Sequence, residues 1–213
     1  MIMTLDDNIS KKAHQHLRRH DKALAAVIKR ARPCELMPRS HLDLFGTLSH
    51  AIVGQQLSLK AAATIYARFC QLLGADDGQP HPAQLRGLGV EQLRSVGLSQ
   101  AKALAVLDLA DKIVSEQVLP LPVLETLDDD AVIQNLVQVR GIGRWTAEMF
   151  LMFQMGRADV LPVDDLGIRK GFMLVYGLDA MPDKTLMIAH AQCWQPYRSV
   201  ASWYLWRAVE LAS

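Results

Sequence analysis

The sequence lacks any apolar run long enough to cross a membrane. A membrane-spanning helix needs about 18 consecutive apolar residues, and no stretch of the 213 residues approaches that length. The first ten residues, MIMTLDDNIS, are too acidic and polar for a secretory signal. These absences exclude an integral membrane protein, and we expect a soluble globular protein of the cytoplasm, associated with the nucleoid if the source is prokaryotic.

Cysteine is also scarce. Cys34, Cys70 and Cys193 are odd in number, far apart and form no CxxC pair, which excludes a disulfide framework, a structural zinc site and an iron–sulfur cluster. The seven histidines show no metal-ligand spacing either. We therefore expect three small buried thiols and no metal ligands.

Period-two alternation, the pattern of half-buried strands, is absent over any useful length. Apolar residues instead recur every three or four positions, as in residues 10–31, 41–74, 99–118 and 199–212. Glycine and proline fall between such blocks. Ser99 stands before the run from Gln100, and the triplet Asp128 to Asp130 stands before a helix expected to begin near Ala131, where carboxylates suit a helix N-terminus. The sequence therefore predicts a compact all-α assembly of short helices.

The net charge of +1 gives no overall signal for a nucleic-acid partner. Residues 1–40, however, hold nine Lys and Arg against four Asp and Glu. Such a basic segment suits contact with phosphates, and it equally suits the solvated face of an amphipathic helix. Its basic residues are Lys11, Lys12, Arg18, Arg19, Lys22, Lys29, Arg30, Arg32 and Arg39.

The most informative stretch is LVQVRGIGRWTAEMFLMF, residues 136–153, which predicts two helices joined by a very short turn. Gly141 and Gly143 permit positive φ and close backbone approach, so the amides at the start of the second helix can bind an anion such as a DNA phosphate. A tight helix–helix corner without a ligand explains the same string. An Asp-rich loop, residues 158–172, follows, and we expect its Asp165 to return beside the hairpin.

The string GIGRWTAEMFLM followed by LPVDD resembles the signature of alkylbase DNA glycosylases, the 3-methyladenine DNA glycosylase II family of the helix-hairpin-helix superfamily. Residues 44–65, 93–103 and 194–208 are similar to the same family, so the resemblance runs from about residue 40 to the end. It implies a single domain over residues 1–213 with two helical lobes around a cleft. It also implies no N-terminal β domain.

The resemblance implies a DNA repair enzyme that flips an alkylated base, such as 3-methyladenine or 7-methylguanine, out of duplex DNA and hydrolyses its N-glycosidic bond. Bifunctional relatives carry a lysine directly before the Thr-Ala of the second hairpin helix, where this chain has Trp145. An abasic site without strand cleavage is therefore expected. A glycosylase of the same fold for another lesion and a non-catalytic DNA-binding protein are the alternatives.

The partner implied is double-stranded DNA containing damaged bases, bound by a monomer. No cofactor is implied, although hairpins of this kind often hold a monovalent cation through backbone carbonyls. The preferred lesion depends on the shape of the pocket and does not follow from the sequence.

The resemblance places the catalytic aspartate at Asp165. Asp164 is the alternative, and it is equally suited to cap the helix that starts near Leu166. The residue that fills the gap left by the flipped base matches Gln56, where other members carry an apolar residue. Gln55 and Leu57 are alternatives, and helix capping is the other interpretation of all three.

Trp145 and Trp206 match the tryptophans that line the family's base pocket, and Trp203 and Tyr204 are further candidates. Aromatic faces attract a cationic alkylated base, yet an aromatic stripe at helical spacing also suits a core. Arg198 is suited to a phosphate or to a salt bridge with an acid. The predicted DNA-binding residues are Gly141, Gly143, Arg144, Gln55, Gln56, Leu57, Ser58, Arg198, Ser199 and Arg169.

Overall fold

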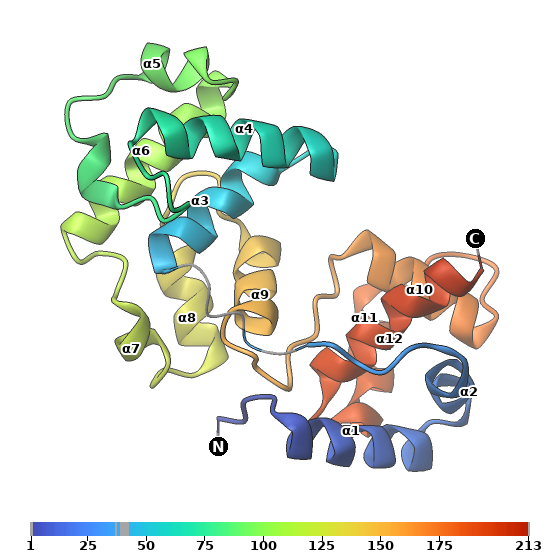
Figure 1. Ribbon diagram of the computed structural model, residues 1–213. Helices are drawn as coiled ribbons and strands as arrows, with labels where there is room; N and C mark the ends of the chain where they lie inside the picture. The colour runs from blue at the N-terminus through green and yellow to red at the C-terminus, as the bar shows by residue number, and fades with distance from the viewer. Residues whose placement is uncertain (1, 37, 39–42, 213) are drawn as a thin grey trace. The chain divides into compact units, whose positions relative to one another are not determined.

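A computed structural model describes residues 2–36, 38 and 43–212, and these residues form twelve α-helices and two short 3₁₀ helices (Figure 1). No β-strand occurs in this part of the chain, apart from an isolated bridge between Thr4 and Arg157. The predicted all-α class is therefore confirmed. Arg39 of the basic segment lies outside the described residues. None of the described helices is long and apolar enough to cross a membrane.

The chain forms two compact units. We call Met1–Arg39 with Leu151–Ser213 the terminal unit, because it joins both ends of the chain, and Ser40–Phe150 the central unit. The sequence pattern does not mark these limits. The single domain over residues 1–213 stays a prediction.

In the terminal unit, α10 and α12 pack closely, as Figure 1 shows. A Cβ atom added to Gly171 of α10 would lie 2.1 Å from the backbone oxygen of Leu205, so only glycine allows this approach. The helices of this unit are α1 (Asp7–His20), α2 (Lys22–Arg30), α10 (Leu166–Tyr176), α11 (Lys184–His190), η2 (Ala191–Trp194) and α12 (Arg198–Leu211).

Two aspartates of the terminal unit mark where helices begin. The periodic block of residues 10–31 breaks at Asp21, whose extended backbone ends α1 and whose side chain caps α2. The loop that follows the hairpin ends at α10, which begins at Leu166, near the helix start expected from the sequence. In both places an aspartate starts a new helix by accepting a backbone N–H bond.

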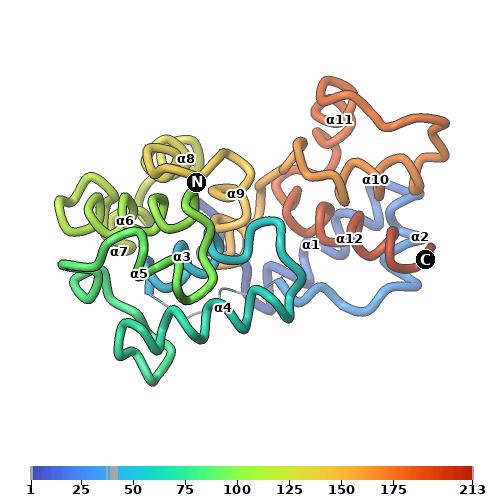
Figure 2. The backbone as a smooth tube through the Cα atoms, turned by 90° about the horizontal axis from the view of Figure 1, so that it is seen from above, coloured from blue at the N-terminus to red at the C-terminus, as the bar shows by residue number. Residues whose placement is uncertain are grey.

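The central unit carries the glycine hairpin, and Figure 2 traces its chain from α3 to α9. The predicted cap Ser99 is confirmed, since it accepts a hydrogen bond from Lys102 N. Of the acidic triplet only Asp128 is the cap, accepting from Ala131 N, because α8 begins at Asp129, earlier than expected. The helices are α3 (Leu44–Gly54), α4 (Leu59–Leu72), η1 (Pro82–Leu85), α5 (Val90–Ser95), α6 (Gln100–Val114), α7 (Leu121–Leu124), α8 (Asp129–Leu136) and α9 (Arg144–Phe153). The last residues of α9 belong to the terminal unit.

The three cysteines are free thiols, but only Cys70 is buried, whereas Cys34 and Cys193 are half-buried. The expectation of three buried thiols is thus wrong for two of them. Burial still raises the pKa of Cys34 to about 12, so this thiol stays protonated and unreactive near neutral pH.

Candidate active site

Asp165 is a buried carboxylate at the N-terminus of α10. Its Oδ1 accepts hydrogen bonds from the backbone N–H of Ile168 at 2.8 Å and from the indole Nε1 of Trp206 at 2.8 Å. The side chain caps the helix, where the helix dipole favours a negative charge. Two donors from different elements therefore fix the orientation of this carboxylate.

Trp206 reaches Asp165 because α10 carries glycine where the indole passes. A Cβ atom added to Gly167 would lie 2.9 Å from Cδ1 of Trp206, closer than a real Cβ contact allows. On another side the indole stacks with Phe153, with ring centroids 5.9 Å apart and planes at 19°. The terminal unit thus brings together Asp165 and Trp206, two of the residues predicted from the sequence.

Asp164 has a different environment. It is 47% exposed and forms an ion pair with Lys184 at 2.5 Å. The cap of α10 is Asp165, so the suggestion that Asp164 caps this helix is wrong.

Arg169, predicted to contact DNA, donates from Nη2 to the backbone oxygen of Pro182 at 3.0 Å, so part of its guanidinium is bonded within the protein.

The glycine turn of the hairpin spans residues 137–143, since α8 ends at Leu136 and α9 begins at Arg144. Gly141 adopts φ 78°, as predicted, whereas Gly143 does not have a left-handed backbone. A Cβ atom added to Gly143 would meet nothing within 4 Å. The first backbone N–H groups of a helix lack intrahelical acceptors, and the space beside Gly143, at the start of α9, is open.

The hairpin turn is held by side chains from elsewhere in the central unit. Gln55 donates from Nε2 to the backbone oxygen of Gly141 at 2.9 Å, and Asp108 accepts from the backbone N–H of Arg140 at 2.7 Å. Burial raises the pKa of Asp108, but hydrogen bonds from Arg140 and Lys112 outweigh it and hold the pKa below its usual value. The turn is therefore tethered through both a carbonyl and an amide.

The predicted wedge segment forms the turn between α3 and α4. Gln56 is exposed and takes φ 58°, a left-handed conformation that is uncommon for a residue with a side chain. Leu57 is 38% exposed and Leu59 is 92% exposed. Ser58 caps α4 by accepting from Ala61 N. The Gln55 side chain is bonded to the backbone of Gly141, so Gln56 is the first side chain of this turn that is free to extend into solvent.

Arg144 and Trp145 open α9. The guanidinium of Arg144 bonds to Glu148 at 2.9 Å and lies 3.5 Å from Asp130, yet its side chain remains 57% exposed. Trp145 is 44% exposed, which is unusual for so large an aromatic side chain. Trp145 belongs to the central unit and Trp206 to the terminal unit.

Trp203 and Tyr204 are core residues. They are 5% and 1% exposed, and Arg207 places its guanidinium 4.8 Å from the ring centroid of Trp203. The hydroxyl of Tyr204 lies 2.8 Å from Nε2 of His14, and burial raises the pKa of Tyr204 to about 12. Their burial inside the terminal unit favours the core interpretation, and their place in a base pocket stays a prediction.

Arg198 and Ser199, at the start of α12, both bond to other residues of the terminal unit. Arg198 makes a salt bridge with both carboxylate oxygens of Asp159, at 2.8 and 2.9 Å. Ser199 is fully buried and donates its hydroxyl to the backbone oxygen of Arg157 at 2.6 Å. The structure therefore favours the salt bridge for Arg198, and it contradicts Ser199 as a phosphate contact.

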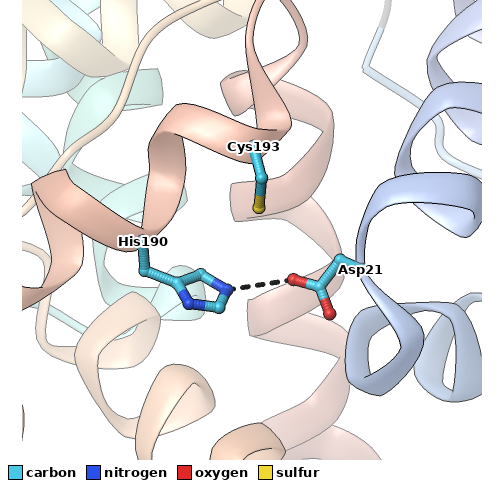
Figure 3. Close-up of side chains that lie close together, drawn as sticks. All are labelled: Asp21, His190 and Cys193. Carbon is cyan, nitrogen blue, oxygen red and sulfur yellow. Dashed lines mark hydrogen bonds and ion pairs between the residues drawn. The ribbon is translucent and has the colours of Figure 1, made fainter.

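One cluster was not apparent from the sequence. Asp21, His190 and Cys193 converge in Figure 3, and in the described part of the chain they form a group with metal-ligand proximity. Oδ2 of Asp21, however, bonds to Tyr176, His190 and Trp194 at 2.5, 3.1 and 2.8 Å, which uses its acceptor capacity. Burial raises the pKa of Cys193, so its thiol is protonated. We interpret the cluster as structural.

The chain was compared with known proteins. A family model described as HhH-GPD superfamily base excision DNA repair protein matches residues 49–196. DNA-3-methyladenine glycosylase 1 of Schizosaccharomyces pombe is 35% identical over 205 residues, which cover 94% of this chain and 88% of that protein. DNA-3-methyladenine glycosylase 2 of Escherichia coli is 31% identical over 83% of this chain and 61% of its own length.

Solved structures agree with these relatives. A crystal structure of a DNA-3-methyladenine glycosidase from Bacillus halodurans is similar with a TM-score of 0.84 and 35% identity, covering 100% of this chain and 94% of that one. The 3-methyladenine DNA glycosylase of Schizosaccharomyces pombe in complex with abasic DNA is similar with a TM-score of 0.79 and 34% identity. It covers 94% of this chain and 98% of that one.

Proposed function

This chain belongs to the HhH-GPD superfamily of base excision DNA repair proteins, and we propose that it is a monofunctional DNA glycosylase for alkylated bases. The observation that carries the proposal is the carboxylate of Asp165, which two hydrogen bonds hold at the start of α10. The relatives named as 3-methyladenine glycosylases point to bases of that class as the substrate.

The proposed chemistry needs one carboxylate and water. A base inside a duplex must first be flipped out, at a cost of a few kcal/mol. Cleavage of the N-glycosidic bond then builds positive charge on the sugar, which Asp165 stabilises while it orients or deprotonates the attacking water. A base alkylated on a ring nitrogen is already cationic and leaves readily, so no general acid is required.

DNA is gripped, in this proposal, by the glycine hairpin. The open space beside Gly143 admits a phosphate to the amides at the start of α9. Gln56, which lies exposed at the tip of its turn, fills the gap left by the flipped base, with Leu57 as its neighbour. Trp206, whose indole lies beside Asp165 in the terminal unit, offers an aromatic face to the cationic base. Arg144, whose side chain is more than half exposed, adds positive charge at the same helix start.

The product is an abasic site in an intact strand, because Trp145 stands where bifunctional relatives have a lysine able to form a Schiff base. The enzyme acts as a monomer on duplex DNA, in the compartment that holds the chromosome, which in a prokaryote is the cytoplasm with its nucleoid. No cofactor takes part in the reaction. A monovalent cation would be held, if present, by backbone carbonyls of the hairpin turn.

The test is to incubate the purified protein with methylated duplex DNA and to identify the released bases by chromatography. We expect 3-methyladenine or 7-methylguanine in the soluble fraction. Parallel duplexes containing hypoxanthine or an oxidised guanine distinguish the other lesion classes. A folded protein that binds the methylated duplex and releases no base would overturn the proposal.

A further inference from the structure

Lys102 of α6 contacts the turn that carries Gln56, and we propose that it is a positioning residue for base flipping. This inference rests on the proposed function, because it assigns the Gln56 turn to the DNA interface. Lys102 itself touches neither substrate nor the reacting atoms. It acts by fixing the turn in place next to the glycine hairpin.

The ammonium of Lys102 binds two backbone oxygens at the end of α3. Nζ donates to the oxygen of Val53 at 2.8 Å and to that of Gln55 at 2.7 Å. The last carbonyls of a helix lack intrahelical donors and carry partial negative charge, so a cation there stabilises the helix end. Burial lowers the pKa of Lys102, because the ammonium has exchanged part of its hydration for these carbonyls.

The residue that follows these carbonyls is the one with the unusual backbone. Gln56 has φ 58°, and a side chain in this left-handed region persists only where the surrounding structure holds it. Gln55 is held at two points directly before it, at its own carbonyl by Lys102 and at its side-chain amide by the oxygen of Gly141. The exposed side chain of Gln56 therefore projects from a rigid base.

The same face of α6 also supports the hairpin turn. Lys102, Ala105 and Asp108 are spaced three residues apart, which places them along one side of the helix. A Cβ atom on Gly141 would lie 3.3 Å from Cβ of Ala105, and Asp108 accepts from the backbone N–H of Arg140 at 2.7 Å. One helix face thus fixes the wedge turn and the phosphate-gripping turn relative to each other.

This arrangement matters for flipping more than for binding. A phosphate grip functions on undamaged DNA, whereas extrusion of a base requires the wedge to enter the stack at a set distance from the grip. A misplacement of about 1 Å at a positioned group costs on the order of 100-fold in rate. Loss of Lys102 should therefore lower base release and leave the affinity for undamaged duplex nearly unchanged.

The experiment compares Lys102→Met, which removes the donors and keeps an aliphatic stem, with Lys102→Arg, which keeps a charged donor. Release of 7-methylguanine from a methylated duplex is followed in single turnover with enzyme in excess. We expect a loss of about tenfold or more for Lys102→Met and partial recovery for Lys102→Arg. Affinity for the undamaged duplex, measured by fluorescence anisotropy, should change less than about threefold, because phosphate contacts dominate it.

A matched control is Arg94→Met, which removes a cation from an exposed ion pair with Glu91 in the same unit. Such a pair contributes little, so this variant should keep the wild-type rate within about twofold. If Lys102→Met does not fold, Lys102→Gln, which keeps an amide donor without the charge, takes its place.

A double-mutant cycle with Gln56→Ala separates positioning from a loss of stability. If Lys102 acts through the turn, Lys102→Met should slow a Gln56→Ala enzyme by less than about twofold, because the side chain that it positions is already absent. Fully additive losses, or unchanged release by Lys102→Met alone, overturn the inference. A wild-type protein that releases no base overturns the proposed function instead, so the two failures are distinguishable.

Discussion

The indole nitrogen of Trp206 donates to Oδ1 of Asp165 at 2.8 Å, although the two residues stand 41 positions apart. The same oxygen accepts the backbone N–H of Ile168. Because both bonds end on one oxygen, the carboxylate cannot rotate without losing two donors. The carboxylate proposed to act in the reaction is therefore preorganised by the helix that it caps and by an aromatic side chain.

Asp165→Asn should abolish base release and keep the fold. Asparagine retains a carbonyl oxygen for both bonds and caps helices as well as aspartate does, so the melting temperature should stay close to that of the wild type. The lost negative charge should slow release by about 100-fold or more. Release of 7-methylguanine from methylated duplex, measured by chromatography, gives the rate.

Asp164→Asn is the matched control for that variant, because it removes an adjacent carboxylate that forms an exposed pair with Lys184. Its rate should stay within about twofold of the wild type. The reverse outcome, with Asp164→Asn inactive and Asp165→Asn active, would assign the chemistry to Asp164.

Trp206→Phe should slow base release by about tenfold. It removes the N–H donor to the Asp165 carboxylate, and a hydrogen bond to a charged group contributes about 1.5–3 kcal/mol. The phenyl ring preserves stacking with Phe153 but has no N–H for Asp165. Trp203→Phe, in the core of the same helix, should lower the melting temperature without changing the single-turnover rate. Equal rates for both variants would show that the indole N–H of Trp206 has no role in the reaction.

The product strand should remain intact after the reaction. Trp145 offers no amine for attack on the sugar, so cleavage should appear only after treatment with hot alkali. A denaturing gel of an end-labelled methylated duplex, run before and after alkali, measures this. Nicking by the purified enzyme without alkali would contradict monofunctional hydrolysis.

The two glycines of the hairpin should respond differently to alanine. Gly141 has φ 78° and lies against Ala105, so Gly141→Ala should destabilise the protein by about 1–2 kcal/mol in urea denaturation. Gly143 faces open space and has an ordinary backbone, so Gly143→Ala should leave the stability unchanged. It should weaken DNA binding by about tenfold through the loss of phosphate approach.

The affinity of the wild-type protein for duplex should also fall as salt rises, since bound phosphates release counterions. Titrations at increasing salt measure this dependence. An affinity that does not change with salt would remove the phosphate grip from the proposal.

Asp21→Asn should destabilise the terminal unit by about 2–3 kcal/mol at neutral pH, because the donors of Tyr176 and Trp194 lose their acceptor. Burial raises the pKa of Asp21, but hydrogen bonds from Leu24 N, Tyr176, Trp194 and His190 hold it below its usual value of 3.8. A lowered folded-state pKa adds stability that is complete above the unfolded value and is lost as the pH falls through the folded one.

The difference between wild type and Asp21→Asn should therefore be constant above about pH 5 and shrink below about pH 4. Urea denaturation across this range measures it. Asp183→Asn, which replaces the exposed cap of α11 by an equivalent one, should change stability by less than about 0.5 kcal/mol. A difference for Asp21→Asn that grows on acidification would refute the explanation.

Local signals predicted much of the fold. Ser99 and Asp128 cap the expected helices, because capping depends on residues only three positions apart. The identity of the cap at α10 was harder, since Asp164 and Asp165 are neighbours and only the backbone decides which one faces the helix. Trp203 and Trp206 are three positions apart on one helix, so their spacing does not separate their roles. In the structure Trp203 lies in the core, whereas Trp206 bonds to Asp165.

Contacts between distant segments could not be predicted. Gln55 and Gly141 stand 86 positions apart, Lys102 and Val53 stand 49 apart, and Asp21 and His190 stand 169 apart. No periodicity or local motif encodes such pairs, because they depend on how helices pack in three dimensions. The resemblance placed Asp165 in the site, but the donors that orient it became visible only in the structure.

The terminal unit is built from both ends of the chain, whereas the central unit is one continuous segment. During synthesis a domain can fold only when all of its residues have left the ribosome. The hairpin and the Gln56 turn can therefore form early, while the surroundings of Asp165 wait for α12, which supplies Trp206. A chain that stops before α12 would thus contain the whole segment of the central unit but lack Trp206, the indole donor to Asp165.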